Sequence, residues 1–345
     1  MTEKRLANSD TGPVVEQITN KQHIAFFQRI VNGFWRTRNG TSGKNFPGAL
    51  PVSLETRDFD KLKKYEYAIC EKTNGMRYFM FFTKHKDEKI CLMVNRGFNF
   101  YKIDIPQDIE GEYWENTLFD GELVQENDSS WTFYIHDCVC WCGVNVSRSS
   151  LFERMSNSLT FVVEGLPSNE NVDFGFKVMA KLFYPYTSEN VTLVEDAMKV
   201  ASHSTDGLIF TPVNLPVCSG TQYSMFKYKT REHHTFDFKV TVNETDDDDN
   251  IKICFFINDR QKLTEFMNGT TSDEDVSEFY EECKKLEGFK NDCILECSYD
   301  IENDKYIPVL VRTDKHLPNG KLTVQRTFVN IKENITYANL REILA

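Results

Sequence analysis

The chain has 345 residues, and 40 Lys and Arg stand against 52 Asp and Glu, which gives a formal charge of −12. Hydrophobic residues make up 40% and charged residues 27%, an ordinary globular composition with room for about two domains. No apolar run approaches the roughly 18 residues of a membrane span, and the polar N-terminus shows no secretory signal. A net acidic chain is also not expected to coat nucleic acid through its phosphates.

The negative charge is concentrated in one stretch of the chain. Residues 239–304 carry 7 basic and 19 acidic residues, and the remaining residues balance to zero. The four consecutive Asp at 246–249 repel one another, which is typical of a solvated loop. The charge therefore excludes a general nucleic-acid coat but leaves room for a local basic cleft.

The ten cysteines are predicted to be reduced thiols, because no secretory signal is visible. Cys138, Cys140 and Cys142 alternate, which on a strand would place all three on one face. No two cysteine pairs have the spacing of a zinc site. We expect small buried hydrophobic side chains.

The first part of the chain combines one helix with many short strands. Ile24, Phe27 and Val31 recur at helical spacing and predict an amphipathic helix near the N-terminus. Turn residues then separate strand-like runs, which lie at 65–71, 78–83, 90–95, 118–124, 131–138, 207–211 and 235–242. Helices are predicted at 147–159 and 191–203. Because a helix does not follow every strand, this pattern favours an α+β fold with mainly antiparallel sheets.

The second part of the chain predicts a small barrel. Strands are expected at 251–257, 293–299, 306–311 and 322–328, with a helical insertion at about 259–289. Several strands interrupted by one helix fit an OB-fold. We expect a first domain at 1–238, an OB-fold domain at 239–329, and a final helix within 330–345 that packs back on the first domain.

Two motifs in the first part carry residues suited to nucleotide chemistry. Lys72 lies in a predicted turn together with Asn74 and Gly75, where an amine and an open backbone can approach a phosphate. Glu122 lies on a predicted strand in a Phe-Asp-Gly-Glu-Leu run, and its carboxylate is a hard oxygen ligand. Taken alone, each has an ordinary explanation as a turn or a surface ion pair.

Three further motifs follow along the chain. Asp206 precedes a strand, and Lys227 and Lys229 share one face of another. A block at 312–319 contributes Arg312, Asp314 and Lys315, followed by Pro-Asn. An isolated acid before a strand or a pair of lysines is usually solvated. Only the occurrence of all five motifs in this order indicates a particular class of protein.

That order resembles the covalent nucleotidyltransferases, the superfamily of mRNA capping guanylyltransferases and ATP-dependent DNA and RNA ligases. Residues 46–54, Lys72-Thr73, the 227–229 block with 235–238, and the 312–319 block are more similar to capping enzymes than to ligases. The resemblance covers roughly residues 45–330. It implies a nucleotidyltransferase domain of antiparallel sheets and helices, followed by a C-terminal OB-fold barrel.

The resemblance also implies a two-step reaction with GTP as substrate. Lys72 would attack the α-phosphate, form a lysyl–N–GMP adduct and release pyrophosphate; a 5′-diphosphate RNA would then take GMP to give the GpppN cap. A lysine must lose its proton to attack, and nearby cations with Mg²⁺ or Mn²⁺ favour that loss. Asp206 and Glu122 are the implied metal ligands.

The remaining site residues take their roles from the family. Lys181 would contact the guanine carbonyl, Arg96 the ribose and phosphate side, and Asp237 the metal or the lysines. Arg312, Asp314 and Lys315 would orient the β- and γ-phosphates as the small domain closes on the triphosphate. The implied nucleotide-binding set is Arg77, Arg96, Glu122, His136, Lys181, Lys227, Lys229 and Asp237.

Two positions depart from the family pattern. Asn74 stands where the family has Asp, and keeps the shape without the charge. His136 stands where the family has the aromatic residue that stacks on the purine, and Tyr134 precedes it on the same predicted face. Either ring could stack. The alternatives are an ATP-dependent polynucleotide ligase and a catalytically weakened capping homologue that acts as a scaffold on RNA polymerase.

The expected partners follow from the same resemblance. The chain is mostly occupied by the transferase and the barrel, so the RNA triphosphatase and the cap methyltransferase are expected on separate chains. The phosphorylated C-terminal domain of RNA polymerase II is a further implied partner. We expect nuclear localisation, or cytoplasmic localisation if the source is viral.

Overall fold

The computed structural model describes residues 16–35, 45–104, 109–166, 175–244, 251–266, 273–313 and 315–344. The chain divides into unit 1, Met1–Tyr228 with Tyr337–Ala345, and unit 2, Lys229–Thr336. The expected boundary at 238 falls inside β14 (Thr235–Glu244), which pairs on both sides with strands of unit 2. Across the described ranges, no helix is long and apolar enough to cross a membrane.

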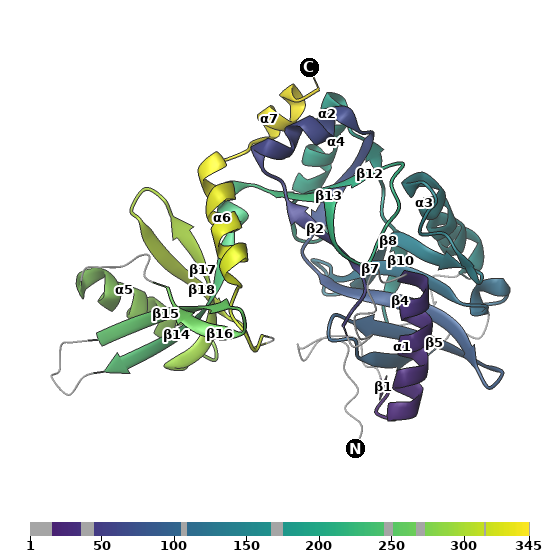
Figure 1. The fold of residues 1–345 in the computed structure, drawn as a ribbon, viewed down its shortest axis with the longest axis horizontal. Coiled ribbons are helices and arrows are strands. Elements are labelled where there is room, and N and C mark those ends of the chain that lie inside the picture. The colour runs from purple at the N-terminus through teal and green to yellow at the C-terminus, as the bar shows by residue number, and fades with distance from the viewer. Residues whose placement is uncertain are drawn as a thin grey trace. The chain divides into compact units, whose positions relative to one another are not determined.

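The larger sheet of unit 1 provides the framework of this unit (Figure 1). Its strands, in spatial order, are β1 (Glu16–Gln17), β6 (Phe100–Ile103), β5 (Glu88–Asn95), β4 (Met76–His85), β7 (Thr117–Gln125), β8 (Trp131–Trp141) and β10 (Lys177–Ala180), with β9 (Val144–Asn145) beside β8. Neighbouring strands run antiparallel from β1 to β8, and β10 runs parallel to β8. The strand content confirms the expected α+β class.

The central strand β4 is buried on both faces, which explains its unbroken apolar run. Met80 and Phe82 enter one core cluster, whereas Phe79 and Phe81 enter the cluster on the opposite face. Helix α1 (Lys21–Trp35) covers the second face with the apolar stripe predicted from its helical spacing. The Asn20 side chain accepts hydrogen bonds from the first backbone amides of this helix and so begins it.

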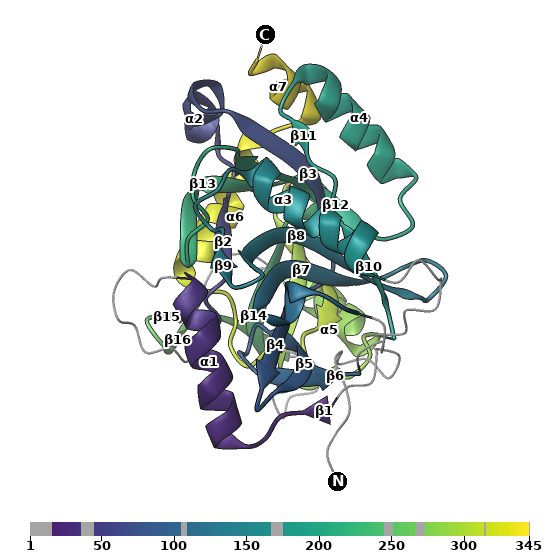
Figure 2. The same ribbon diagram turned by 90° about the vertical axis from the view of Figure 1, so that its right-hand side faces the viewer.

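The second sheet of unit 1 contains the strand with Lys72. Its order is β11 (Tyr184–Pro185), β3 (Tyr67–Thr73), β12 (Thr205–Pro212), β13 (Gly220–Lys229) and β2 (Ala49–Ser53). The helices α2 (Phe59–Lys64), α3 (Leu151–Thr160), α4 (Ser188–Lys199) and α7 (Tyr337–Glu342) complete the unit. Helix α7 packs on α4, where the Tyr186 hydroxyl donates to the Leu340 carbonyl at 2.6 Å and Arg341 pairs with Glu195 (Figure 2).

Two details of the first unit differ from expectation. Lys72 lies on β3 itself and not in a turn, and the chain then crosses to β4 in the other sheet. Gly75 makes this crossing possible, because a Cβ there would lie 2.8 Å from the Leu123 carbonyl oxygen. Cys138 and Cys140 enter clusters on opposite faces, because a register shift in β8 breaks the alternation. The prediction that they share one face was wrong.

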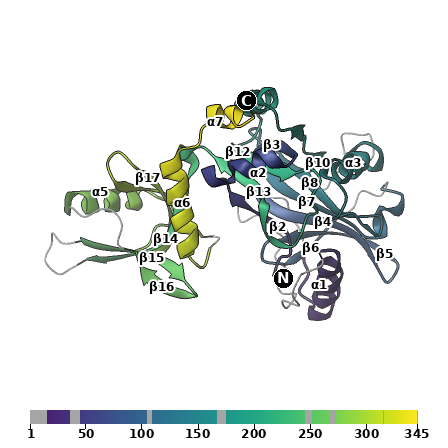
Figure 3. The ribbon, with the colours of Figure 1, turned by 45° about the horizontal axis from the view of Figure 1, so that its top comes forward.

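Unit 2 contains an open five-stranded antiparallel sheet in its described residues (Figure 3). Its order is β16 (Lys262–Glu265), β15 (Ile251–Asp259), β14, β17 (Asp292–Asp300) and β18 (Lys305–Val311), with helices α5 (Asp273–Lys284) and α6 (Lys321–Glu333). Strand pairing in this order, with a helix between the third and fourth strands along the chain, is the arrangement of a partly open OB-fold.

The predicted strand at 322–328 was wrong, because this segment belongs to helix α6. Val324, Phe328 and Ile331 recur at helical spacing and pack against the unit 2 core, and this tertiary contact overrides the local β-branched pattern. The segment at 259–289 is not wholly helical either, since it opens with β16. Every residue of that strand is exposed, so no apolar alternation marks it in the sequence.

Candidate active site

Lys72 and Asp206 form the centre of the candidate site. The Lys72 Nζ atom lies 2.7 Å from Asp206 Oδ1, and the carboxylate is 8% exposed. Gly207 pairs with Lys72 and Thr205 pairs with Thr73, so Asp206 is the extra residue of a β-bulge. A bulge re-aims a side chain, and here the carboxylate meets the amine. The two residues are 134 positions apart, and the fold brings them together as their assigned roles require.

The buried hydroxyl of Thr73 connects two further predicted site residues. It donates to the Glu122 carboxylate on β7 and accepts a hydrogen bond from Lys181 Nζ at 2.9 Å. Lys181 follows β10, so this contact joins the two sheets of unit 1 next to Lys72. Sequence reasoning missed Thr73, although its position directly after the lysine was a usable signal.

Arg77 is held by groups of the protein. Its Nε and Nη2 atoms donate to the two oxygens of Asp120 at 2.9 and 2.5 Å, and Nη1 donates to the Ala49 carbonyl at 2.6 Å. Burial opposes ionisation of Asp120, but the charges of Arg77 and His136 hold its pKa well below the usual range. Arg77 therefore binds protein groups through its guanidinium, and the nucleotide contact predicted for it from the sequence stays a prediction.

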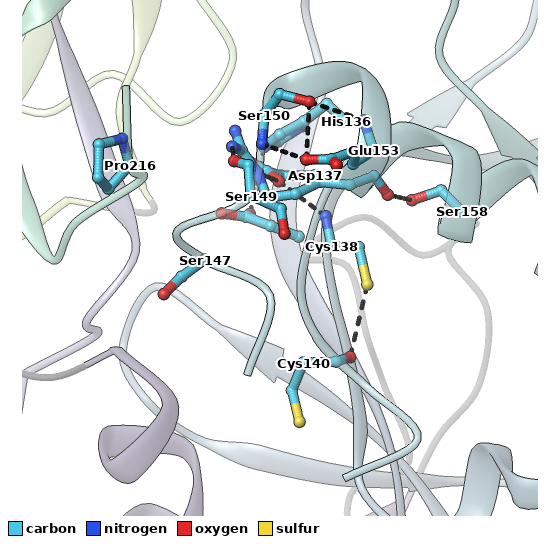
Figure 4. Close-up of polar contacts among 12 residues, drawn as sticks. His136, Asp137, Cys138, Cys140, Ser147, Ser149, Ser150, Glu153, Ser158 and Pro216 are labelled. Atoms are coloured by element: carbon cyan, nitrogen blue, oxygen red, sulfur yellow. Dashed lines mark hydrogen bonds and ion pairs between the residues drawn. The ribbon is translucent and has the colours of Figure 1, made fainter. Parts of the chain in front are cut away.

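Both candidate stacking rings also contact carboxylates. His136 Nε2 lies 3.2 Å from Asp120 Oδ1, and the Tyr134 hydroxyl donates to Glu126 at 2.9 Å. The next residue, Asp137, pairs with the fully buried Arg154 of α3 at 2.6 Å. Figure 4 shows His136 and Asp137 beside the start of α3, where Ser150 and Glu153 form a reciprocal cap.

The remaining predicted cations of unit 1, Arg96, Lys227 and Lys229, are less buried than Arg77 and Lys181. Arg96 follows β5; burial and then the charge of Arg77 lower its pKa, and Glu122 and Asp120 act against that change. Lys227 and Lys229 alternate with buried neighbours on β13, which agrees with their predicted common face. The Lys227 carbonyl accepts from the Leu54 amide at 2.9 Å, which fixes this strand beside β2.

A second cluster of predicted residues lies within unit 2. Asp237 on β14 accepts from Arg312 Nη1 at 2.9 Å, from Lys315 Nζ, and from the Asn319 side chain at 2.8 Å. Arg312 Nη1 also lies 2.9 Å from Glu296, which pairs with Asp237 across β14 and β17. The domain prediction grouped Asp237 with the first domain, whereas it belongs to unit 2 with Arg312 and Lys315. Asp314 lies outside the described residues.

The carboxylates of unit 1 fit one particular mode of metal binding. Among the residues that the structure describes, no group of three His, Cys, Asp or Glu side chains is arranged to hold an ion. Mg²⁺ commonly uses only one or two carboxylates together with substrate phosphates and water. Asp206 and Glu122 fit that mode, because each presents a carboxylate next to the strand that bears Lys72.

A lysine–aspartate pair on neighbouring strands of one sheet, joined through Thr73 to the other sheet and followed by an OB-fold, defines a nucleotidyltransferase of the ligase and capping-enzyme type. The family model described as mRNA capping enzyme, catalytic domain matches residues 10–231, and the one described as mRNA capping enzyme, C-terminal domain matches residues 226–341. The chain belongs to the mRNA capping enzyme family.

Relatives named mRNA-capping enzyme agree with this assignment. The mRNA-capping enzyme subunit alpha of Schizosaccharomyces pombe is 26% identical, over 87% of this chain and 80% of its own length. The subunit alpha of Saccharomyces cerevisiae is also 26% identical, over 87% and 79%. The mRNA-capping enzyme of Danio rerio is 23% identical, and the match spans 96% of this chain and 54% of that protein. A solved ATP-dependent DNA ligase from bacteriophage T7 is 13% identical with a TM-score of 0.38, and its match covers 77% of this chain and 98% of the ligase.

Proposed function

We propose that the chain is an mRNA guanylyltransferase that transfers GMP from GTP through a covalent adduct on Lys72. The observation that carries this proposal is the pairing of Lys72 Nζ with the buried Asp206 carboxylate, next to the Thr73–Lys181 contact. Family membership supports the reaction class, and the geometry supports the choice of nucleophile.

In the first step, the Lys72 amine attacks the α-phosphorus of GTP. A P–N bond forms, the bond from the α-phosphorus to the bridging oxygen of the β-phosphate breaks, and pyrophosphate leaves with that electron pair. The ammonium proton must depart first, and Asp206, at 2.7 Å, is placed to hold the amine and to accept its proton. A divalent ion at Asp206 and Glu122 would supply charge neutralisation of the triphosphate when bound.

In the second step, a terminal phosphate oxygen of a 5′-diphosphate RNA attacks the same phosphorus. The P–N bond breaks, the lysine amine takes back a proton, and the GpppN cap is released. Lys181 and Thr73 lie on the side where we place the guanine, because a lysine donor suits its carbonyl oxygen. We assign Arg312 and Lys315 to the departing pyrophosphate, with Asp237 as the group that orients both.

The other proposed nucleotide contacts come from unit 1 and from the block that contains Arg312. Arg96, Lys227 and Lys229 are proposed phosphate or ribose contacts, supported by their charge; Lys227 and Lys229 are half-buried, and Arg96 is exposed. His136 is the proposed stacking ring, since the Tyr134 ring already packs against His203. Asp314 keeps its proposed role with Arg312 from sequence alone.

The names of the relatives support a proposal for the cellular setting. Those from the two yeasts are named subunit alpha, which supports an RNA triphosphatase on a separate chain. We propose that the cap methyltransferase is separate as well, that the phosphorylated C-terminal domain of RNA polymerase II recruits the enzyme, and that the enzyme acts in the nucleus.

The decisive experiment is covalent labelling of the purified chain. It is incubated with α-labelled GTP or ATP and Mg²⁺ or Mn²⁺, then separated on a denaturing gel. We expect label from GTP only, stable to alkali and lost in acid as a phosphoramidate should be. Lys72→Ala abolishes the label, whereas Lys84→Ala, which removes an exposed lysine paired with Glu115, leaves it unchanged.

The outcomes separate the alternatives. Label from ATP would identify a ligase, and the absence of any label from the folded protein would identify a scaffold. When labelled enzyme is freed of GTP and mixed with RNA, the label should move to 5′-diphosphate ends and not to 5′-monophosphate ends. Transfer to monophosphate ends would contradict the second step.

A further inference from the structure

His203 lies between two carboxylates that come from different sheets of unit 1. Its Nε2 atom is 3.3 Å from Glu71 on β3, and its Nδ1 atom is 3.3 Å from Glu126, which follows β7. The His203 side chain is only 6% exposed. The Tyr134 ring packs against the imidazole at 4.9 Å, so the ring is enclosed on several sides.

The chemistry of this arrangement favours a charged ring. A neutral imidazole carries one N–H and can donate to one carboxylate, whereas an imidazolium can donate to both. The hydrogen bond with Glu71 raises the pKa of His203, burial opposes this change, and the charges of Glu71 and Glu126 add to it. Tyr134 and Ser202 donate to Glu126 at 2.9 and 2.7 Å, so that acid is fixed from three sides.

The segment from Ser202 to Asp206 is attached to both sheets. The Asn127 amide donates to the Ser202 carbonyl at 2.6 Å, which joins the segment to the β7–β8 connection. The Asn74 amide donates to the Ser204 carbonyl at 2.9 Å, which joins it to the end of β3. His203 stands between these two backbone contacts and adds a side-chain contact in each direction. The segment then ends in the bulge that aims Asp206 at Lys72.

We propose that His203 is a positioning residue for guanylyl transfer, which fastens the Ser202–Asp206 segment to both sheets and so holds Asp206 against the Lys72 amine. This inference rests on the proposed function for its catalytic consequence. The structural part of the proposal, that His203 aligns Asp206 with Lys72, does not depend on which nucleotide reacts.

The effect on the rate should exceed the effect on GTP binding. Guanine contacts are assigned to Lys181 and Thr73, whereas the hydrogen bonds of the His203 ring, among the described residues, are with Glu71 and Glu126. A small displacement of a reacting pair can lower a rate by about a hundredfold. We expect His203→Leu to lower the single-turnover rate of adduct formation about 10- to 100-fold, with the apparent Kd for GTP changed by less than about threefold.

The test compares four whole-chain proteins: wild type, His203→Leu, His203→Leu/Glu71→Gln, and His233→Leu as a control at an exposed histidine. The double variant removes the carboxylate that the first substitution leaves without its histidine, so it should recover stability. It should not recover the rate, because the link between the sheets is still missing. Recovery of both would assign His203 a merely structural role and overturn the proposal.

A second readout does not require activity. Amine acetylation followed by mass spectrometry reports how firmly Lys72 is held, with Lys84 as an internal reference. We expect acetylation of Lys72 to accelerate several-fold in His203→Leu and not in His233→Leu. If this change occurs but wild type forms no GMP adduct, the proposed function fails and the positioning role stands. An unchanged rate of acetylation at Lys72 overturns the positioning role, whatever the labelling shows.

Discussion

The pairing of Arg77 with Asp120 allows a sharp test. The family resemblance predicts that this arginine contacts the nucleotide, whereas its hydrogen bonds in the structure are with protein groups. The side chains are 8% and 2% exposed, and two donor–acceptor contacts of 2.9 and 2.5 Å join them. Removal of one partner from such a pair leaves a buried charge and typically costs about 3–5 kcal/mol. We therefore expect Arg77→Met to destabilise unit 1 by about this amount, which is roughly 6–20 °C in Tm for a domain of this size.

The four tryptophans of the chain make the measurement specific. All belong to unit 1, so their fluorescence follows the unfolding of this unit; they are Trp35, Trp114, Trp131 and Trp141. Urea and thermal unfolding are compared for wild type, Arg77→Met, Asp120→Asn and the double variant. Because the partners contact each other, the double variant should lose less stability than the sum of the single variants, by about 0.5–3 kcal/mol.

A matched control comes from the same strand. Lys84 is also on β4 and pairs with Glu115, but both side chains are substantially exposed. Lys84→Met should change the midpoint little, since exposed ion pairs contribute little to stability. If Arg77→Met unfolds at the wild-type midpoint yet forms no GMP adduct, Arg77 acts on the substrate and our assignment is wrong.

Three further predictions concern backbone, charge and pH. Gly75→Ala should destabilise unit 1 by about 1–3 kcal/mol and slow adduct formation, because the new methyl group would meet the Leu123 carbonyl; thermal unfolding and labelling check this. Asp237→Ala should reduce adduct formation about 10- to 100-fold, since Arg312 loses a charged hydrogen-bond partner; an unchanged single-turnover rate would exclude this role. The hydrogen bonds of His203 raise its pKa on folding, so its stabilising contribution is complete below about pH 6.5 and is lost as pH rises through the folded value. The stability difference between wild type and His203→Leu in urea should therefore be larger at pH 6 than at pH 9, and a constant difference would contradict an ionised ring.

Elements with a strong apolar period were predictable from sequence. Helix α1 forms where its apolar spacing predicted it, and strands β4 and β17 appear close to their expected limits, because burial keeps both faces of β4 and one side of the other two elements apolar. Strand β16 was missed because it is exposed along its whole length and has no such period. The division of unit 1 into two sheets was also not predictable, since local pattern identifies a strand but not its neighbours.

In the candidate site too, the sequence identified single residues but not the residues that they contact. Family motifs named Lys72 and Asp206, and the fold places them in contact. The bulge that makes this contact has no signal in a single sequence, because it depends on the register of two distant strands. The partnership of Asp237 with Arg312 was hidden for the same reason, and Glu296 carried no motif at all.

The return of helix α7 to unit 1 has a consequence for synthesis of the protein. Unit 2 is inserted within unit 1, so the ribosome completes it before it produces the last helix of the first unit. Chains fold from the N-terminus as they emerge, and unit 1 must wait for α7 to cover α4. A chain broken off after unit 2 would contain every proposed catalytic residue and still lack this cover. A chain that ends before α7 would therefore leave this side of α4 uncovered and accessible to cellular proteases.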